Sequence, residues 1–248
     1  MSSDLFKDWL ELIPTAGPGV TLYGERAGSR TAGLAELKRL LADHFVGEAT
    51  IVKAGGYTKA AEIIAHSLPS AKKTQSGDLG ELLATEYLNS ETSFVVPIKK
   101  LRWKSDREMA MHGNDVIGLD TSTQPIQILK GECKSRMIFG ESIVAEAVES
   151  LDKHDGRPNP STLAFITKRL YEEGRDTEAE VFRDLQASGS INAKNITHLI
   201  FAVSGNNPAK HLLGGAKSKH RGIKRVNAAI LVSDHGRFVS SVYDTHGK

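Results

Sequence analysis

The hydrophobic pattern of the chain alternates between a helical and an extended period. Apolar residues spaced three and four apart predict helices at 33–45, 57–68, 78–89, 141–154, 160–173 and 177–187. Alternating or short continuous apolar runs predict strands at 94–98, 113–119, 126–135, 196–203, 227–233 and 238–243. Helices and strands in this order predict an α/β fold, with a mixed β-sheet flanked by helices.

The polar stretch 70–77 divides the chain and is interpreted as a linker. It separates a mainly helical N-terminal extension, residues 1–70, from a core at 71–248. The extension is a possible partner-binding region, although packing against the sheet of its own chain is an equally good interpretation. At 248 residues, the chain is long enough for one large domain.

Composition excludes several classes of protein. With 40% hydrophobic and 25% charged residues the chain is globular, and no apolar stretch approaches the ~20 residues of a membrane span. The single cysteine, Cys133, excludes an internal disulfide and any multi-cysteine zinc site. The first residues lack the basic and apolar regions of a signal peptide. We expect a cytoplasmic protein without membrane contact.

The distribution of charge is more informative than its sum. The formal net charge is +2, yet no acidic residue lies between Asp184 and Asp234, where seven basic residues occur. This segment carries +7 and the rest of the chain −5. We interpret six of these residues as a DNA-binding set, with a solvated basic loop as the alternative. They are Lys210, Lys217, Lys219, Arg221, Lys224 and Arg225.

Three carboxylates follow one another on successive elements. Glu81 lies in a predicted helix, Asp115 at the start of a predicted strand, and Glu132 in the next strand, two residues before Lys134. Alternation places Glu132 and Lys134 on one face of their strand and Cys133 on the other. Carboxylate oxygens suit Mg²⁺, and a lysine beside them suits a phosphate. Each residue alone also fits a helix surface, a turn or an exposed cross-strand pair.

The ordered set resembles the PD-(D/E)xK nuclease superfamily, in which a helix Glu, a strand Asp and a following (D/E)-x-K strand build a metal-dependent phosphodiesterase site. Asn114 stands where that motif has proline. Within the superfamily, the Gly-Glu-Leu-Leu, His-Gly-Asn-Asp and Glu-Cys-Lys-Ser segments resemble the HamA family, the nuclease subunit of the Hachiman anti-phage defence system. These segments extend from Gly77 to Ser135.

The resemblance implies a restriction-endonuclease-like fold and a Mg²⁺-dependent DNA endonuclease, with Mn²⁺ as a substitute ion. It implies that Glu81, Asp115, Glu132 and the Cys133 carbonyl hold the metal, and that Lys134 positions the attacking water. The expected partners are DNA and a helicase encoded nearby.

Two further points stay open. Glu86 is the alternative helix ligand, because it falls inside the apolar face of the helix that carries Glu81. The alternative functions are a catalytically silent DNA-binding or assembly subunit, and a restriction-type or RNA-cutting relative. The segment from Gly214 to Ser218 resembles the end of a phosphate-binding loop, but Ala216 stands where the loop needs glycine and no glycine lies five residues before it. We therefore expect no nucleotide cofactor.

Overall fold

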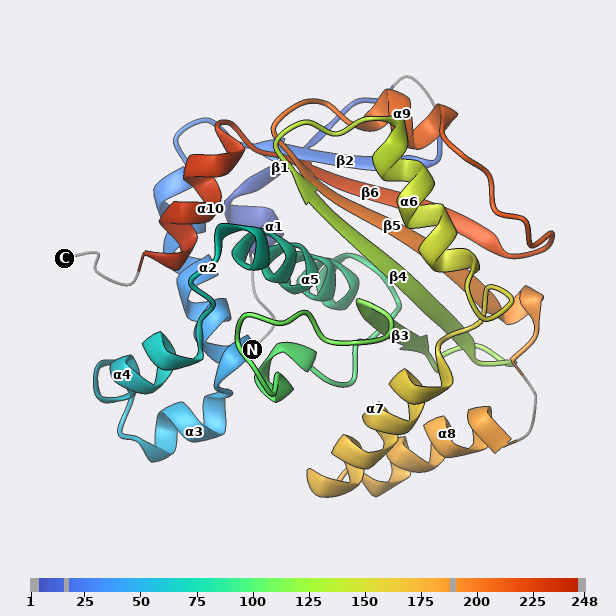
Figure 1. The fold of residues 1–248 in the computed structure, drawn as a ribbon, viewed down its shortest axis with the longest axis horizontal. Helices are drawn as coiled ribbons and strands as arrows, with labels where there is room; N and C mark the ends of the chain where they lie inside the picture. The colour runs from blue at the N-terminus through green and yellow to red at the C-terminus, as the bar shows by residue number, and fades with distance from the viewer. Residues whose placement is uncertain (1–4, 16–17, 188–190, 245–248) are drawn as a thin grey trace.

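The computed structural model describes residues 5–15, 18–187 and 191–244 and confirms the predicted α/β class. Within these ranges, six strands form one mixed sheet in the order β1-β2-β6-β5-β4-β3 (Figure 1). The strands are β1 (Leu10–Ile13), β2 (Val20–Glu25), β3 (Val116–Asp120), β4 (Gln127–Arg136), β5 (Ile196–Ser204) and β6 (Lys224–Leu231). Strands β2, β6, β5 and β4 run parallel, and the edge strands β1 and β3 are antiparallel to their neighbours.

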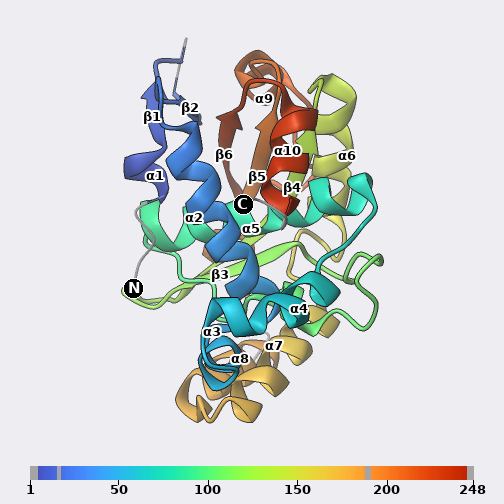
Figure 2. The same ribbon diagram turned by 90° about the vertical axis from the view of Figure 1, so that its left-hand side faces the viewer.

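Helices cover both faces of the sheet. They are α1 (Leu5–Asp8), α2 (Arg30–Phe45), α3 (Glu48–Lys53), α4 (Tyr57–Ser67), α5 (Lys72–Glu91), α6 (Glu141–Asp152), α7 (Pro160–Glu172), α8 (Asp176–Ala187), α9 (Ala209–Gly214) and α10 (His235–Tyr243). Two short 3-10 helices, η1 (Lys100–Trp103) and η2 (Ala193–Asn195), lie between them. Helices α2, α5 and α10 pack on one face, whereas α6 and α9 pack on the other (Figures 1 and 2). Helices α7 and α8 cover the β3 end of this second face.

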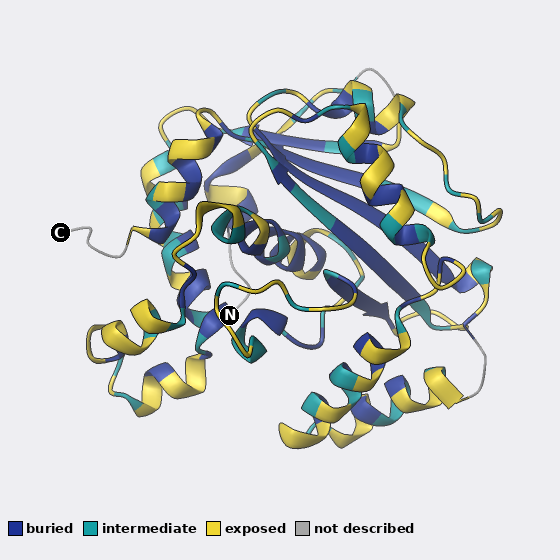
Figure 3. Ribbon diagram, in the orientation of Figure 1, coloured by how far each residue is buried: buried dark blue, intermediate teal, exposed yellow. Residues whose placement is uncertain are grey.

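The core consists of the two layers on either side of the central strands. Every residue of β5 is buried, as expected for a parallel strand covered on both faces (Figure 3). Leu199 and Phe201 pack toward α5, and Ile200 and Ala202 pack toward α6. None of the helices in the described ranges is long and apolar enough to cross a membrane.

Three predictions about single elements are wrong. Residues 238–243 form the end of α10 and not a strand. Their buried residues, Phe238, Val239, Val242 and Tyr243, follow helical spacing, and the Asp234 side chain caps the helix by accepting from the Arg237 N–H. Residues 94–98 make only an isolated bridge from Val95 to Leu119. The predicted linker at 70–77 lies mostly inside α5, which begins at Lys72.

The N-terminal extension is helical in large part but also supplies two strands to the sheet. Strand β1 pairs with β2, and β2 pairs in parallel with β6. Trp9, fully buried, stacks on Phe238 of α10 with ring centroids 5.3 Å apart. Residues 5–15 and 18–45 therefore share the core of the rest of the chain, while α3 and α4 carry mostly exposed side chains (Figure 3).

Candidate active site

Asp115 and Glu132 lie close enough for their charges to interact. The antiparallel register of β3 and β4 ends with Val116 paired to Gly131, and the residues that adjoin this last pair are Asp115, in the turn before β3, and Glu132 of β4. The Cys133 N–H donates to Asp115 Oδ2 at 2.7 Å, which holds that carboxylate against β4. The two acids predicted from separate elements are thus neighbours because their strands pair.

Glu81 reaches the same region from α5. A Cβ atom built on Gly80 would lie 3.5 Å from Ser135 Cβ and 3.7 Å from Cys133 Cβ, so the helix passes close to β4 there. Oε2 of Glu81 is buried and has no hydrogen-bond partner among the described residues. Glu81 and Asp115 also line a common small cavity of about 10 Å³, roughly the space of one water molecule.

Burial and mutual repulsion disfavour the charged forms of these acids. Burial raises the pKa of Glu81 to about 8; Lys100 opposes this shift and Asp115 adds to it. Burial and then the charge of Glu132 raise the pKa of Asp115 to about 7. A bound cation would relieve this repulsion, since an opposite charge favours ionised carboxylates.

Basic groups adjoin the carboxylates on two sides. Lys134 Nζ lies 3.0 Å from Glu132 Oε1, and the Ser150 hydroxyl of α6 donates to Glu132 Oε2 at 2.7 Å. Lys100, nearly buried, donates to the carbonyls of Asn114 and Asp115 and lies 4.0 Å from Glu81 Oε2. Lys100 and Ser150 were not among the site residues predicted from the sequence. The one feature of the sequence that indicates a buried Lys100 is its position between Ile98 and Leu101, which are apolar and buried.

Asn114 has a role that the proline of the motif could not fill. Its N–H donates to Thr162 Oγ1 at 3.1 Å, and its side-chain oxygen accepts from the Asn159 N–H at 2.7 Å. Proline has no N–H and no side-chain acceptor. Asn114 therefore ties the turn before Asp115 to the start of α7.

The carboxylates suit a partly hydrated cation better than a closed metal cage. Within the described ranges, no three His, Cys, Asp or Glu side chains are grouped closely enough to hold an ion together. Mg²⁺ is usually held by one or two carboxylates and keeps several waters. The opposed pair Asp115 and Glu132, with the unpartnered oxygen of Glu81 nearby, fits that pattern of oxygen donors.

Comparison with known proteins assigns the sequence of this chain to a family. The sequence profile named HamA matches residues 4–245, almost the whole chain. The chain belongs to the HamA family. A curated relative described as "Hachiman protein HamA", from Bacillus cereus, is 31% identical over 182 residues. That alignment covers 72% of this chain and 63% of the relative, so the chain spans less than two thirds of the relative's length.

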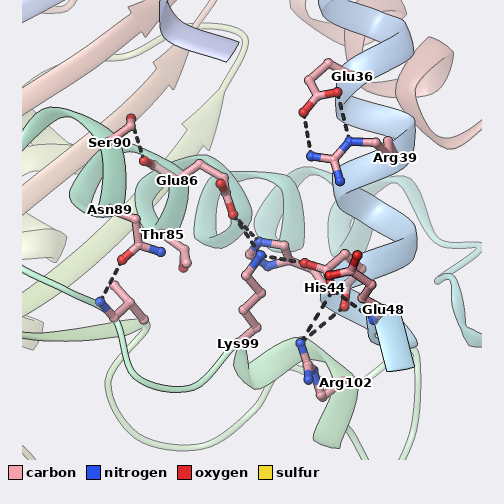
Figure 4. Close-up of polar contacts among 12 residues, drawn as sticks. Glu36, Arg39, His44, Glu48, Thr85, Glu86, Asn89, Ser90, Lys99 and Arg102 are labelled. Atoms are coloured by element: carbon pink, nitrogen blue, oxygen red, sulfur yellow. Dashed lines mark hydrogen bonds and ion pairs between the residues drawn. The ribbon is translucent and has the colours of Figure 1, made fainter. Parts of the chain in front are cut away.

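The alternative ligand, Glu86, lies elsewhere on α5 in this HamA-family chain. Its carboxylate is 2.7 Å from His44 Nε2 and 3.2 Å from Lys99 Nζ (Figure 4). Although burial opposes the shift, the hydrogen bond from His44 and the charge of Lys99 hold the pKa of Glu86 below its usual range. Glu86 is thus bound within a separate network that joins α2 to α5, and Glu81 is the helix carboxylate beside Asp115.

The six basic residues predicted to bind DNA lie apart from the carboxylates. Five of them are exposed and Arg225 is half-buried. One loop carries Lys217, Lys219 and Arg221. It is hydrogen-bonded to the end of α6, where Asp152 accepts from the Ser218 hydroxyl and the Lys219 N–H. Lys224 and Arg225 begin β6, two strand spacings or roughly 10 Å from β4.

Proposed function

We propose that this protein is a Mg²⁺-dependent DNA endonuclease and the effector of a Hachiman-type anti-phage defence system. The observation that carries the proposal is the proximity of Asp115 and Glu132, with Lys134 3.0 Å from Glu132 and Glu81 near Asp115. Membership in the HamA family supports the same assignment. Oxygen ligands for a metal ion with a basic side chain beside them suit metal-dependent hydrolysis of a phosphodiester.

Each residue has a distinct task in the proposed reaction. Asp115 and Glu132 would hold the metal directly, and Glu81 would hold it through one of its waters, since Glu81 and Asp115 line a common cavity of about that size. When bound, the metal polarises a phosphate oxygen and lowers the pKa of its water. The Cys133 carbonyl would join the carboxylates, since the N–H and C=O of one strand residue point to the same edge and its N–H points at Asp115. Lys134 would orient the attacking water and stabilise the negative charge that develops on the phosphate.

The basic loop would bind the DNA backbone while the carboxylates act on one phosphate. Lysine and arginine contacts to phosphates supply affinity without reading sequence. The exposed side chains of Lys217, Lys219 and Arg221 suit this role because each can reach solvent. We therefore propose DNA binding of low sequence preference.

Plasmid cleavage tests the proposed activity. Wild-type protein should nick or linearise plasmid in Mg²⁺ or Mn²⁺ and do neither in EDTA. Glu132→Ala and Lys134→Ala should each abolish cleavage, whereas Glu146→Ala, an exposed acid on α6, should not. Binding of plasmid without any cleavage would instead favour a silent DNA-binding subunit, and cleavage confined to RNA would favour an RNA-cutting relative.

We also propose that a helicase subunit partners this chain and restrains it, as the HamA resemblance implies. Helices α3 and α4 provide a candidate contact surface, because Val52, Tyr57 and Ile63 are exposed there. Co-expression with the neighbouring helicase, followed by size exclusion, should give a complex that buries more than ~1,200 Å² in total. Tyr57→Asp with Ile63→Asp should dissociate the complex, whereas Met137→Asp, at an exposed site elsewhere, should not.

A further inference from the structure

A second cavity, of about 270 Å³, lies beside the candidate active site. One wall is η1 with the loop after it, and the opposite wall is the first part of α7. The side chains that decide its chemistry are Lys100, Trp103, Met109, His112, Thr162 and Phe165. A nucleic-acid base is small enough to enter a space of this size.

The cavity adjoins the carboxylates directly. Lys100 lines it and also lines the small cavity that holds Glu81 and Asp115. Thr162, on the opposite wall, accepts the N–H of Asn114, the residue before Asp115. A group bound here would therefore lie next to a phosphate held at Asp115.

Both lysines that line the cavity are engaged by groups of the protein. Lys104 pairs with Asp78 at 2.8 Å, and Lys100 donates to the carbonyl of Asn114. The first amides of α7 are capped by Asn159, whose side chain accepts from the Ser161 N–H at 2.9 Å. A phosphate would find its usual donors engaged here, so an uncharged ligand fits better.

The remaining lining suits a flat ring with a polar edge. Trp103 and Phe165 supply aromatic surface, and Met109 supplies a flexible thioether. The Arg169 guanidinium lies over one face of each ring, 4.1 Å from the Trp103 centroid and 5.2 Å from the Phe165 centroid, so a ligand ring has the remaining faces and edges. The indole Nε1 of Trp103 is buried and has no hydrogen-bond partner in the described ranges. This group can only donate, so a ligand that reaches it must present a carbonyl oxygen or ring nitrogen on its edge. Nucleobases have both the ring and the acceptors.

We propose that this cavity receives one unstacked nucleobase of the DNA strand whose phosphate lies at Asp115 and Glu132. The inference rests on the proposed nuclease function and specifies its substrate. A base in an intact duplex must be extruded before it can enter such a pocket, at a cost of a few kcal/mol, whereas a single strand offers its bases freely. The substrate class is therefore single-stranded or locally melted DNA.

Binding without metal separates this proposal from catalysis. The probes are a fluorescent oligothymidylate, an abasic strand of equal length and charge, and a blunt duplex, measured by anisotropy in EDTA. The abasic strand and the duplex should both bind more weakly than the oligothymidylate. For the abasic strand the loss should be about 5- to 100-fold, the usual effect of base stacking on a protein aromatic ring.

Two variants locate the effect in the cavity. Ala110→Phe, on the exposed loop, should fill the cavity and lower oligothymidylate affinity to that of the abasic strand, without changing abasic binding. Met109→Ala should weaken oligothymidylate binding, and Met137→Ala, at a similarly exposed methionine outside the cavity, should not.

Equal affinity for the oligothymidylate and the abasic strand would overturn the proposal, as would tighter binding of the duplex or an Ala110→Phe variant that binds normally. In any of these cases, Mg²⁺-dependent cleavage that is lost in Glu132→Ala would leave the nuclease function standing. If Ala110→Phe abolishes base-dependent binding but wild-type protein does not cleave DNA in Mg²⁺, the proposal of a base-binding cavity stands and the proposal of nuclease activity is overturned.

Discussion

Replacing Asn114 by the proline of the motif should destabilise this protein. Asn114 is 6% exposed, and the substitution removes both its N–H bond to Thr162 and its side-chain bond from Asn159. Each buried hydrogen bond contributes about 1 kcal/mol, and each abandoned partner costs about as much again. We expect the free energy of unfolding to fall by about 2–4 kcal/mol, which for a chain of this length lowers Tm by roughly 5–15 °C.

Thermal and urea denaturation, followed by circular dichroism, measure this loss. Asn114→Ala is the matched control because it keeps the backbone N–H and removes only the side-chain bond, so it should show about half of the loss. Cleavage by Asn114→Pro should also fall, since the turn fixes the backbone of Asp115, to which Lys100 donates. A proline variant as stable as wild type would refute the role assigned to Asn114.

Three further predictions concern other parts of the molecule. Replacing three exposed basic residues together should weaken binding to all DNA sequences alike and reduce the salt dependence by roughly 0.9 log unit for each lost phosphate contact; unchanged binding would mean a merely solvated loop. These residues are Lys217, Lys219 and Arg221. Glu81→Gln should abolish Mg²⁺-dependent cleavage and Glu86→Gln should retain most of it; the opposite result would make Glu86 the ligand. Burial lowers the pKa of His44, so stability should fall below pH ~6.5 as the unfolded chain takes up the proton; urea unfolding should show a shallower fall in His44→Gln.

Local hydrophobic patterns predicted the helices and strands in which the buried residues recur with the period of that helix or strand. Alternation along β4 placed Glu132 and Lys134 on one face and Cys133 on the other, and the contacts with Ser150 of α6 and Gly80 of α5 agree. Helical spacing likewise identified α6 and α8 to within two residues. Such periods depend on neighbours within a few residues of one another, which the sequence displays directly.

Elements whose structure depends on distant contacts were harder to predict. The segment 238–243 is rich in aromatic and β-branched residues, which favour strands, yet its burial against Trp9 and the cap at Asp234 make it a helix. Residues 72–77 have little apolar periodicity, and they continue α5 because Ser76 donates to Ser135 of β4. Trp9 and Ser135 both lie far in the sequence from the segments that they contact.

The residues of the candidate site likewise include some that local sequence predicted and some that depend on tertiary structure. Its acidic residues and Lys134 lie in recognisable segments, whereas Lys100 enters from a 3-10 helix that has no sequence signature. The choice between Glu81 and Glu86 also depended on tertiary structure, since both lie on the same helix. Glu86 contacts His44 and Lys99, whereas Glu81 lies near Asp115 and Lys100. Residue type suggested the chemistry, and strand pairing determined which residues meet.

The most direct test of the nuclease assignment is the single-turnover rate at which Glu132→Gln cleaves labelled DNA in Mg²⁺. This change keeps the size of the side chain and its bond from Ser150, and removes only the charge beside Asp115 and Lys134. We predict a rate at least ~100-fold below wild type, with Glu146→Gln on the exposed side of α6 unaffected. A Glu132→Gln protein that cleaves at the wild-type rate would contradict the assignment of these carboxylates as the active site.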